Sequence, residues 1–172
     1  ITRPFARSKP NIPQKLADQV KNKFPGQALN DTNGEVEYRI SDCCNPIPGD
    51  DVIGFMAQEG SIWIHRTNCT EAIQLMSKYG NRIVKTNWSN REAVTYLSGI
   101  RLAGFDKQGL INEIIKVISE QMSLNIRSFH IDSTGEVYEA TILLLVHDTD
   151  DLNRLMNELK KVKGISNVYR IS

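Results

Sequence analysis

The hydrophobic pattern of residues 95–172 restricts the fold of this 172-residue chain more than any other feature of its sequence. Apolar side chains alternate with polar ones in some stretches, as in β-strands, and recur every three to four residues in others, as in helices. The pattern predicts strands over 96–105, 125–132, 138–146 and 165–171. It predicts helices over 110–122 and 152–162, and either Thr149 or Asp150 is expected to cap the second helix. A turn is expected at 133–136. The resulting order, β-α-β-β-α-β, is that of a split ferredoxin-like fold.

A smaller unit of mixed α and β structure is predicted over residues 35–90. Short strands are expected at 36–40, 52–56, 62–65 and 83–88, and a helix is expected to begin near Cys69. The apolar face of that helix is predicted to consist of Ala72, Ile73, Leu75, Met76 and Tyr79. A unit of about 55 residues is small for an unaided hydrophobic core and often needs a metal ion or a partner. The fold class is therefore α+β, with a small cysteine-containing domain ahead of a ferredoxin-like one.

Residues 1–34 are predicted to be a leader or linker that carries a short helix built on Leu16, Val20 and Phe24. The first thirty residues contain six Lys/Arg and one acidic residue, so this segment either contacts phosphate or is a solvated connector. The chain begins Ile1-Thr2-Arg3 without an initiator Met, which suggests a piece of a longer protein. We find no secretory signal and no apolar run near the about 20 residues that cross a bilayer, so no membrane partner is expected.

Four residues of the smaller unit form a set of the type that binds zinc. His65 and Cys69 are four positions apart at the predicted start of the helix, and Cys43 and Cys44 lie upstream in a turn rich in Pro and Gly. Three thiolates and one imidazole would fill all four positions of a tetrahedral structural zinc site. Three cysteines, two of them adjacent, do not resemble a secreted disulfide scaffold and suit the reducing cytoplasm.

The adjacency of Cys43 and Cys44 leaves several interpretations open. Neighbouring side chains diverge, so either the Pro46–Pro48 turn bends the chain enough for both thiols to bind or only one of them does. A second interpretation is that the thiols are buried and inert and that His65 is a surface histidine. A third is a cysteine nucleophile with His65 as its base, although no orienting acid or oxyanion hole is visible.

Two other groups of residues are candidates for binding. Asp106-Lys107-Gln108-Gly109 precedes the first helix of the ferredoxin-like domain, where Gly109 would let a carboxylate approach free N–H groups; alternatively, Asp106 is simply the helix cap. The smaller unit is net acidic, but basic side chains near the predicted helix end, with Trp63 available for stacking, could contact an RNA backbone. The alternative is that these cations are solvated and the tryptophans belong to the core. The predicted RNA contacts are Arg66, Lys78, Arg82 and Lys85.

The run from Cys43 to Asp50, Cys-Cys-Asn-Pro-Ile-Pro-Gly-Asp, together with His65-Arg66-Thr67-Asn68-Cys69, resembles the C-terminal regulatory region of the RelA/SpoT family. These bacterial stringent-response enzymes make and degrade (p)ppGpp. The resemblance implies a zinc-finger-like, conserved-cysteine (RIS) domain over 35–90 and an RRM-like ACT domain over 95–172. It also implies that Cys43, Cys44, His65 and Cys69 are the core of the finger. The candidate effector loop then includes Gly104, Asp106, Gly109 and Leu110.

This resemblance implies a regulatory rather than a catalytic fragment. The synthetase and hydrolase domains of a parent GTP pyrophosphokinase would lie upstream, and the sequence contains no Walker lysine motif, HExxH or GxSxG. The expected partners are the ribosome and its RNA in the presence of uncharged tRNA, and the upstream catalytic domains. The alternative is an ACT dimer that binds an amino acid and regulates the enzyme through that ligand.

Overall fold

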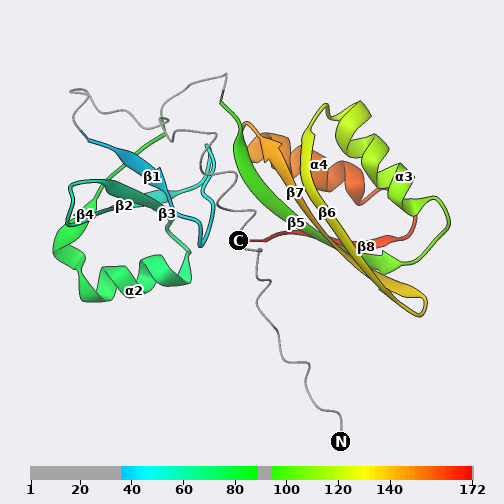
Figure 1. Cartoon of the computed structure of the whole chain (residues 1–172), viewed down its shortest axis with the longest axis horizontal. Coiled ribbons are helices and arrows are strands. Elements are labelled where there is room, and N and C mark those ends of the chain that lie inside the picture. Colours follow the sequence, from blue (N-terminus) through cyan, green and yellow to red (C-terminus); the bar gives the residue numbers. More distant parts are fainter. Residues whose placement is uncertain (1–35, 89–93, 172) are drawn as a thin grey trace, which may run out of the picture.

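The computed structural model of the protein describes residues 36–88 and 94–171, which form two four-stranded sheets accompanied by helices (Figure 1). The predicted leader helix built on Leu16, Val20 and Phe24 lies outside the described residues. Within the described ranges, no helix is both long and apolar enough to cross a membrane. The fold is of the α+β class that the sequence predicts.

The first sheet contains short strands and carries one helix. Its elements are β1 (Tyr38–Ile40), β2 (Val52–Met56), β3 (Ile62–Arg66), α2 (Thr70–Lys78), the 3-10 turn η1 (Gly80–Arg82) and β4 (Ile83–Val84). The strand order is β1-β3-β2-β4, with β1 parallel to β3 and the other pairs antiparallel. The last strand, predicted over 83–88, ends at Val84, and Trp88 packs edge-to-face on Tyr96 with 5.6 Å between the ring centroids.

The second sheet has the predicted order of elements and is wholly antiparallel. Its elements are β5 (Tyr96–Phe105), α3 (Leu110–Ile115), the π-helical turn η2 (Lys116–Gln121), β6 (Asn125–Thr134), β7 (Val137–Val146), α4 (Thr149–Leu159) and β8 (Ile165–Ile171). The strand order is β6-β7-β5-β8. Figure 1 shows α3 and α4 on the same side of this sheet. Alternate residues of β7, such as Tyr138, Ile142 and Leu144, face these helices and are fully buried.

The predicted apolar face of α2 is wrong in part. Ala72 is fully buried against the cysteines and Leu75 packs beside it, but Ile73, Met76 and Tyr79 are 55%, 42% and 48% exposed. The strands beneath α2 have two to five residues each, so they cover only one row of the helix. Amphipathic spacing predicts which residues could share a face, but not how much surface is available to cover them.

The boundaries of the second domain differ from the prediction at three places. The helix predicted over 110–122 ends at Ile115 and continues as the π turn η2 to Gln121, and Ile111 and Ile115 are exposed. The cap of α4 is neither Thr149 nor Asp150 but Asp148, whose side chain accepts from the Asp151 amide at 2.8 Å. β6 continues to Thr134, so the turn is only two residues long.

Candidate metal centre

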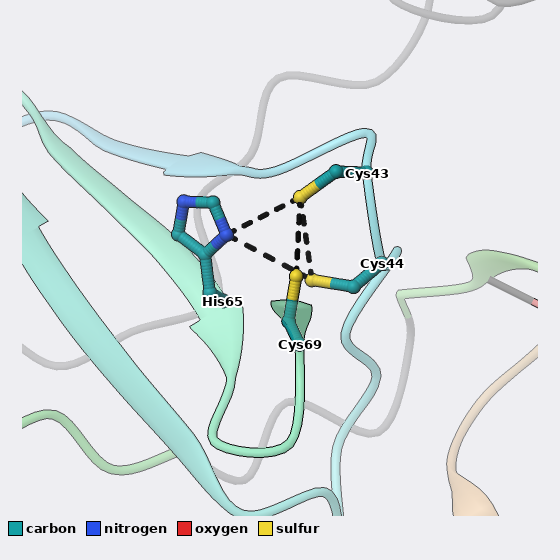
Figure 2. Close-up of side chains that lie close together, drawn as sticks. All are labelled: Cys43, Cys44, His65 and Cys69. Atoms are coloured by element: carbon teal, nitrogen blue, oxygen red, sulfur yellow. Dashed lines mark hydrogen bonds between the residues drawn. The ribbon is translucent and has the colours of Figure 1, made fainter. Parts of the chain in front are cut away.

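Four side chains that could hold a metal ion come together beside the first sheet: Cys43, Cys44, His65 and Cys69 (Figure 2). Their ligand atoms all lie within 4.8 Å of one another. The two adjacent cysteines are in the turn after β1, the histidine is on β3, and the last cysteine immediately precedes α2. Three separate segments of the first domain therefore meet at this cluster.

A helical turn between Ser41 and Asn45 allows both adjacent thiols to face the same centre. The Asn45 amide donates to the Ser41 carbonyl at 2.9 Å, and Asn45 itself has a positive φ of 40°. Successive side chains are about 100° apart on a helical turn, whereas they point to opposite sides of a strand. The bend that brings the thiols together therefore lies before Pro46, and not at the Pro46–Pro48 turn.

The spacing of the ligand atoms fits a tetrahedral metal ion. Zn–S bonds of about 2.3 Å and Zn–N bonds of about 2.0 Å imply S···S distances of about 3.8 Å and S···N distances of about 3.5 Å. Cys43 Sγ lies 3.8 Å from Cys44 Sγ and 3.5 Å from Cys69 Sγ. His65 Nδ1 lies 3.3 Å from Cys43 Sγ and 4.0 Å from Cys44 Sγ. Four protein ligands leave no open position for water, which is the arrangement of a structural site.

Two neighbours of the cluster escape prediction from the sequence. Phe55 lies edge-on to the His65 ring, with 5.7 Å between the centroids, and is buried with it. The Arg66 amide donates to Cys44 Sγ at 3.4 Å. The contact with Phe55 orients the His65 ring, and the hydrogen bond from the Arg66 amide stabilises a thiolate at Cys44. Contacts of this kind surround the ligands of metal sites. The apolar residues of β2 indicate that Phe55 is buried, but no local sequence signal indicates that it packs against His65.

The electrostatics of the cluster favour a thiolate at Cys44. The pKa of Cys44 is lowered to about 4, first because Cys43 Sγ donates a hydrogen bond to its sulfur. The contact with His65 Nδ1 and the hydrogen bond from the Arg66 amide lower this pKa further. The hydrogen bond between Cys43 and Cys44, together with burial, raises the pKa of Cys43. A thiolate is the form that binds a metal ion, and a bound cation would deprotonate the remaining thiols.

The geometry weighs against the two other interpretations of these residues. His65 is only 5% exposed, so it is not a surface histidine. Its Nδ1 faces two thiols at once, and Figure 2 shows the four side chains pointing at one another. A nucleophile with its base would instead present one thiol to a substrate. The arrangement is suited to enclosing an ion.

The residues of the predicted effector loop occupy different environments. Gly104 lies within β5, where a β-carbon would overlap the Gly164 carbonyl oxygen, and Leu110 belongs to the core. Gly109 has a φ of 84° and precedes α3, with open space around it. Asp106 is exposed and is not the helix cap, because α3 begins after Gly109. Effector binding by this loop stays a prediction.

Three of the four predicted RNA contacts are exposed around the end of α2: Lys78, Arg82 and Lys85. The fourth, Arg66, is half-buried beside the metal cluster. The Arg82 guanidinium lies 5.6 Å from the centroid of the exposed Tyr79 ring. Trp63 is half-buried, and the Arg39 guanidinium already lies 5.7 Å from its ring. The exposed cations and Tyr79, rather than Trp63, form the accessible surface.

Comparison with known protein families accounts for both domains. The RelA/SpoT RIS domain matches residues 28–89, and the ACT domain matches residues 92–170. The matches coincide with the part of the chain that contains the cysteine cluster and the part that has the ferredoxin-like order.

Similar whole proteins have names connected with (p)ppGpp. The chain is 27% identical over 135 residues to the bifunctional (p)ppGpp synthase/hydrolase RelA of Mycobacterium tuberculosis. The aligned region is 78% of this chain and 18% of that protein. The chain is also 26% identical over 155 residues to the GTP pyrophosphokinase of Escherichia coli K12, an alignment that covers 89% of this chain and 21% of that protein. The crystal structure of the ACT domain from GTP pyrophosphokinase of Chlorobium tepidum is 36% identical, with a TM-score of 0.42, over 45% of this chain and all of that one. The chain thus spans about a fifth of the curated relatives it matches.

Proposed function

The chain belongs to the RelA/SpoT family, whose C-terminal regulatory region it matches, and we propose that it is a non-catalytic module that docks on ribosomal RNA. In this proposal it acts in the cytoplasm and controls synthetase or hydrolase domains that lie upstream in the same protein. The names of its relatives support a parent that is a GTP pyrophosphokinase, with or without (p)ppGpp hydrolase activity.

The four-residue cluster is proposed to bind structural Zn²⁺. Cys43, Cys44 and Cys69 would bind as thiolates, and His65 would bind through Nδ1, which is the ring nitrogen that faces them. When bound, the ion supplies a cross-link between the turn after β1, strand β3 and the start of α2. The apolar cluster around it contains few buried residues, so such a cross-link would add stability that this core does not provide.

The exposed cations at the end of α2 are the observation that supports docking on RNA. Lys78, Arg82 and Lys85 come from the helix, from η1 and from the segment after β4, and all three are exposed. Exposed cations can neutralise phosphates and release counterions. Tyr79 adds an exposed ring on which an unpaired base could stack.

Co-sedimentation with ribosomes tests this function directly. The 172-residue chain is expected to pellet with ribosomes at low salt, more strongly with uncharged tRNA in the A site, and to be released as salt is raised. A chain that stays in the supernatant at every salt concentration, with and without tRNA, would contradict the proposal. A parallel assay with GTP and ATP is expected to show no pyrophosphoryl transfer.

A further inference from the structure

The segment that directly follows Cys43 and Cys44, two of the proposed metal ligands, packs against the second domain. We call residues 45–50 the clamp segment. Ile47 is fully buried in the hydrophobic core of the ACT domain, among residues such as Ile100 and Leu152. The Pro48 carbonyl accepts from the Thr149 amide, the first residue of α4, at 2.9 Å.

An arginine of the last strand holds the far end of the clamp segment. Arg170 on β8 makes a bidentate ion pair with Asp50, at 2.7 Å for Nη1–Oδ1 and 2.9 Å for Nη2–Oδ2. The two side chains are only 14% and 11% exposed. Asp50 also accepts from the Ile47 amide, and its carbonyl accepts from the Trp88 indole at 3.0 Å. Planar, bidentate pairs of this kind tolerate little displacement of either partner.

The same arginine reaches the residue next to a metal ligand. Arg170 Nη2 donates to the Asn45 carbonyl at 3.0 Å, and Asn45 directly follows Cys44. Asn45 is held in its positive-φ conformation by the turn that aims the two thiols at the cluster. The position of that carbonyl therefore depends on the conformation that metal binding would fix.

We propose that residues 45–50 form a metal-dependent clamp between the two domains. Binding of Zn²⁺ by Cys43 and Cys44 fixes the segment in the conformation that Arg170 recognises, so metal binding and domain docking stabilise each other. This inference rests on the proposed zinc site and gives the bound ion a second role, which is to stabilise the contact between the two domains. Because coupling between two equilibria is reciprocal, it is measurable from either end.

The first experiment measures zinc affinity when the docking contact is removed. In the 172-residue chain, Arg170→Met is expected to weaken Zn²⁺ binding by about 10-fold in competition with a chromophoric chelator. Arg154→Met is the matched control, since Arg154 is an exposed arginine of the same domain that pairs with Asp151 on its own helix. Equal affinity in the Arg170→Met and unsubstituted chains would overturn the clamp and leave the zinc site standing. Absence of zinc binding in the unsubstituted chain would overturn both, whereas ribosome co-sedimentation would still be decided by its own assay.

The second experiment needs no substitution and reads the coupling from the other end. Hydrogen exchange of the Thr149 amide and the Trp88 indole N–H is followed with Zn²⁺ bound and after its removal by a chelator. Both protons are donated to the clamp segment, so their exchange is expected to accelerate about 10-fold or more without zinc. The Asp106 amide, which donates to Glu136 within the second domain, is the internal control and is expected not to change. Unchanged protection at Thr149 and Trp88 would overturn the proposal.

Discussion

Gly104 on β5 and Gly164, which precedes β8, approach so closely that a β-carbon on Gly104 would overlap the Gly164 carbonyl oxygen. The same carbonyl accepts from the Phe105 amide at 2.9 Å, and the pairing of β5 with β8 shifts register between Ala103 and Gly104. The contact joins backbone to backbone, so no side-chain rotation can relieve it. Gly104 is thus required by the packing of the ACT domain itself.

Substitution of Gly104 by Ala is expected to destabilise the ACT domain by about 3 kcal/mol, because the backbone of β5 or of the Gly164 turn must move. Urea unfolding followed by NMR signals of β5 and β8 measures the loss. Gly80→Ala is the control, because a β-carbon there meets nothing within 4 Å. Equal stability of the Gly104→Ala and unsubstituted chains would show that the close approach is relieved at no cost. If the destabilisation is found, loss of amino-acid binding in this variant would not identify Gly104 as an effector contact.

Removal of a proposed metal ligand is expected to affect the two domains differently. His65→Ala or Cys69→Ser should abolish tight Zn²⁺ binding and lower the stability of the first domain by several kcal/mol, since metal and folding energies are coupled there. The second domain has its own large core and is expected to keep its fold. Metal content and domain-resolved thermal unfolding measure both effects, with Asn68→Ala, an exposed residue between the two ligands, as control. Full unfolding of both domains in either ligand variant would contradict their separate cores.

The pH dependence of the ACT domain is expected to include a contribution from Asp151. Burial alone would raise the pKa of this carboxyl, but hydrogen bonds from His147 and Arg154 outweigh it and hold the pKa below its ordinary value. The carboxylate therefore stabilises the folded state fully above the ordinary pKa of about 4, and this contribution is lost as pH falls below it. Asp151→Asn should lower stability by about 1 kcal/mol or less at pH 6 and abolish this part of the acid dependence. Denaturant unfolding of β7 and α4 at pH 6, 4 and 3 measures it; an unaltered pH profile would contradict the assignment.

Sequence predicts helices and strands well where the spacing of apolar residues within one segment decides which side chains are buried. Tyr138, Ala140 and Ile142 are buried between more exposed neighbours, as a sheet covered on one face predicts, whereas every residue from 142 to 146 is buried. The four residues of the metal cluster are recognisable because thiols and imidazole have few other common uses in that combination. Both signals are contained in residue type and spacing.

Features that depend on distant parts of the chain escape prediction. Arg170 and Asp50 are 120 positions apart, and neither is unusual in its own segment, so no local pattern pairs them. Ile73 has correct helical spacing but no surface to cover it, and the π turn after Ile115 changes the helical period without a sequence signal. These outcomes are decided by tertiary packing, which intrinsic patterns do not contain.

The basic surface at the end of α2 makes a prediction about salt dependence that separates RNA docking from a general loss of structure. Lys78→Ala, Arg82→Ala and Lys85→Ala should each weaken ribosome binding and reduce the slope of log K against log salt by about one, if each side chain contacts a phosphate. All three side chains are exposed, so the thermal unfolding of each variant should match that of the unsubstituted chain.

The matched control for this series is Lys161→Ala. Lys161 is also exposed, follows α4 in the ACT domain and pairs with Glu158 at 2.7 Å. It should leave both affinity and salt slope unchanged. Arg66 is not a suitable probe, because it is half-buried and its amide donates to Cys44 Sγ, so its substitution would disturb the metal cluster. An unchanged salt slope in all three α2 variants, with ribosome binding intact, would place the RNA-binding surface elsewhere on the module and exclude the charged end of α2 as its site.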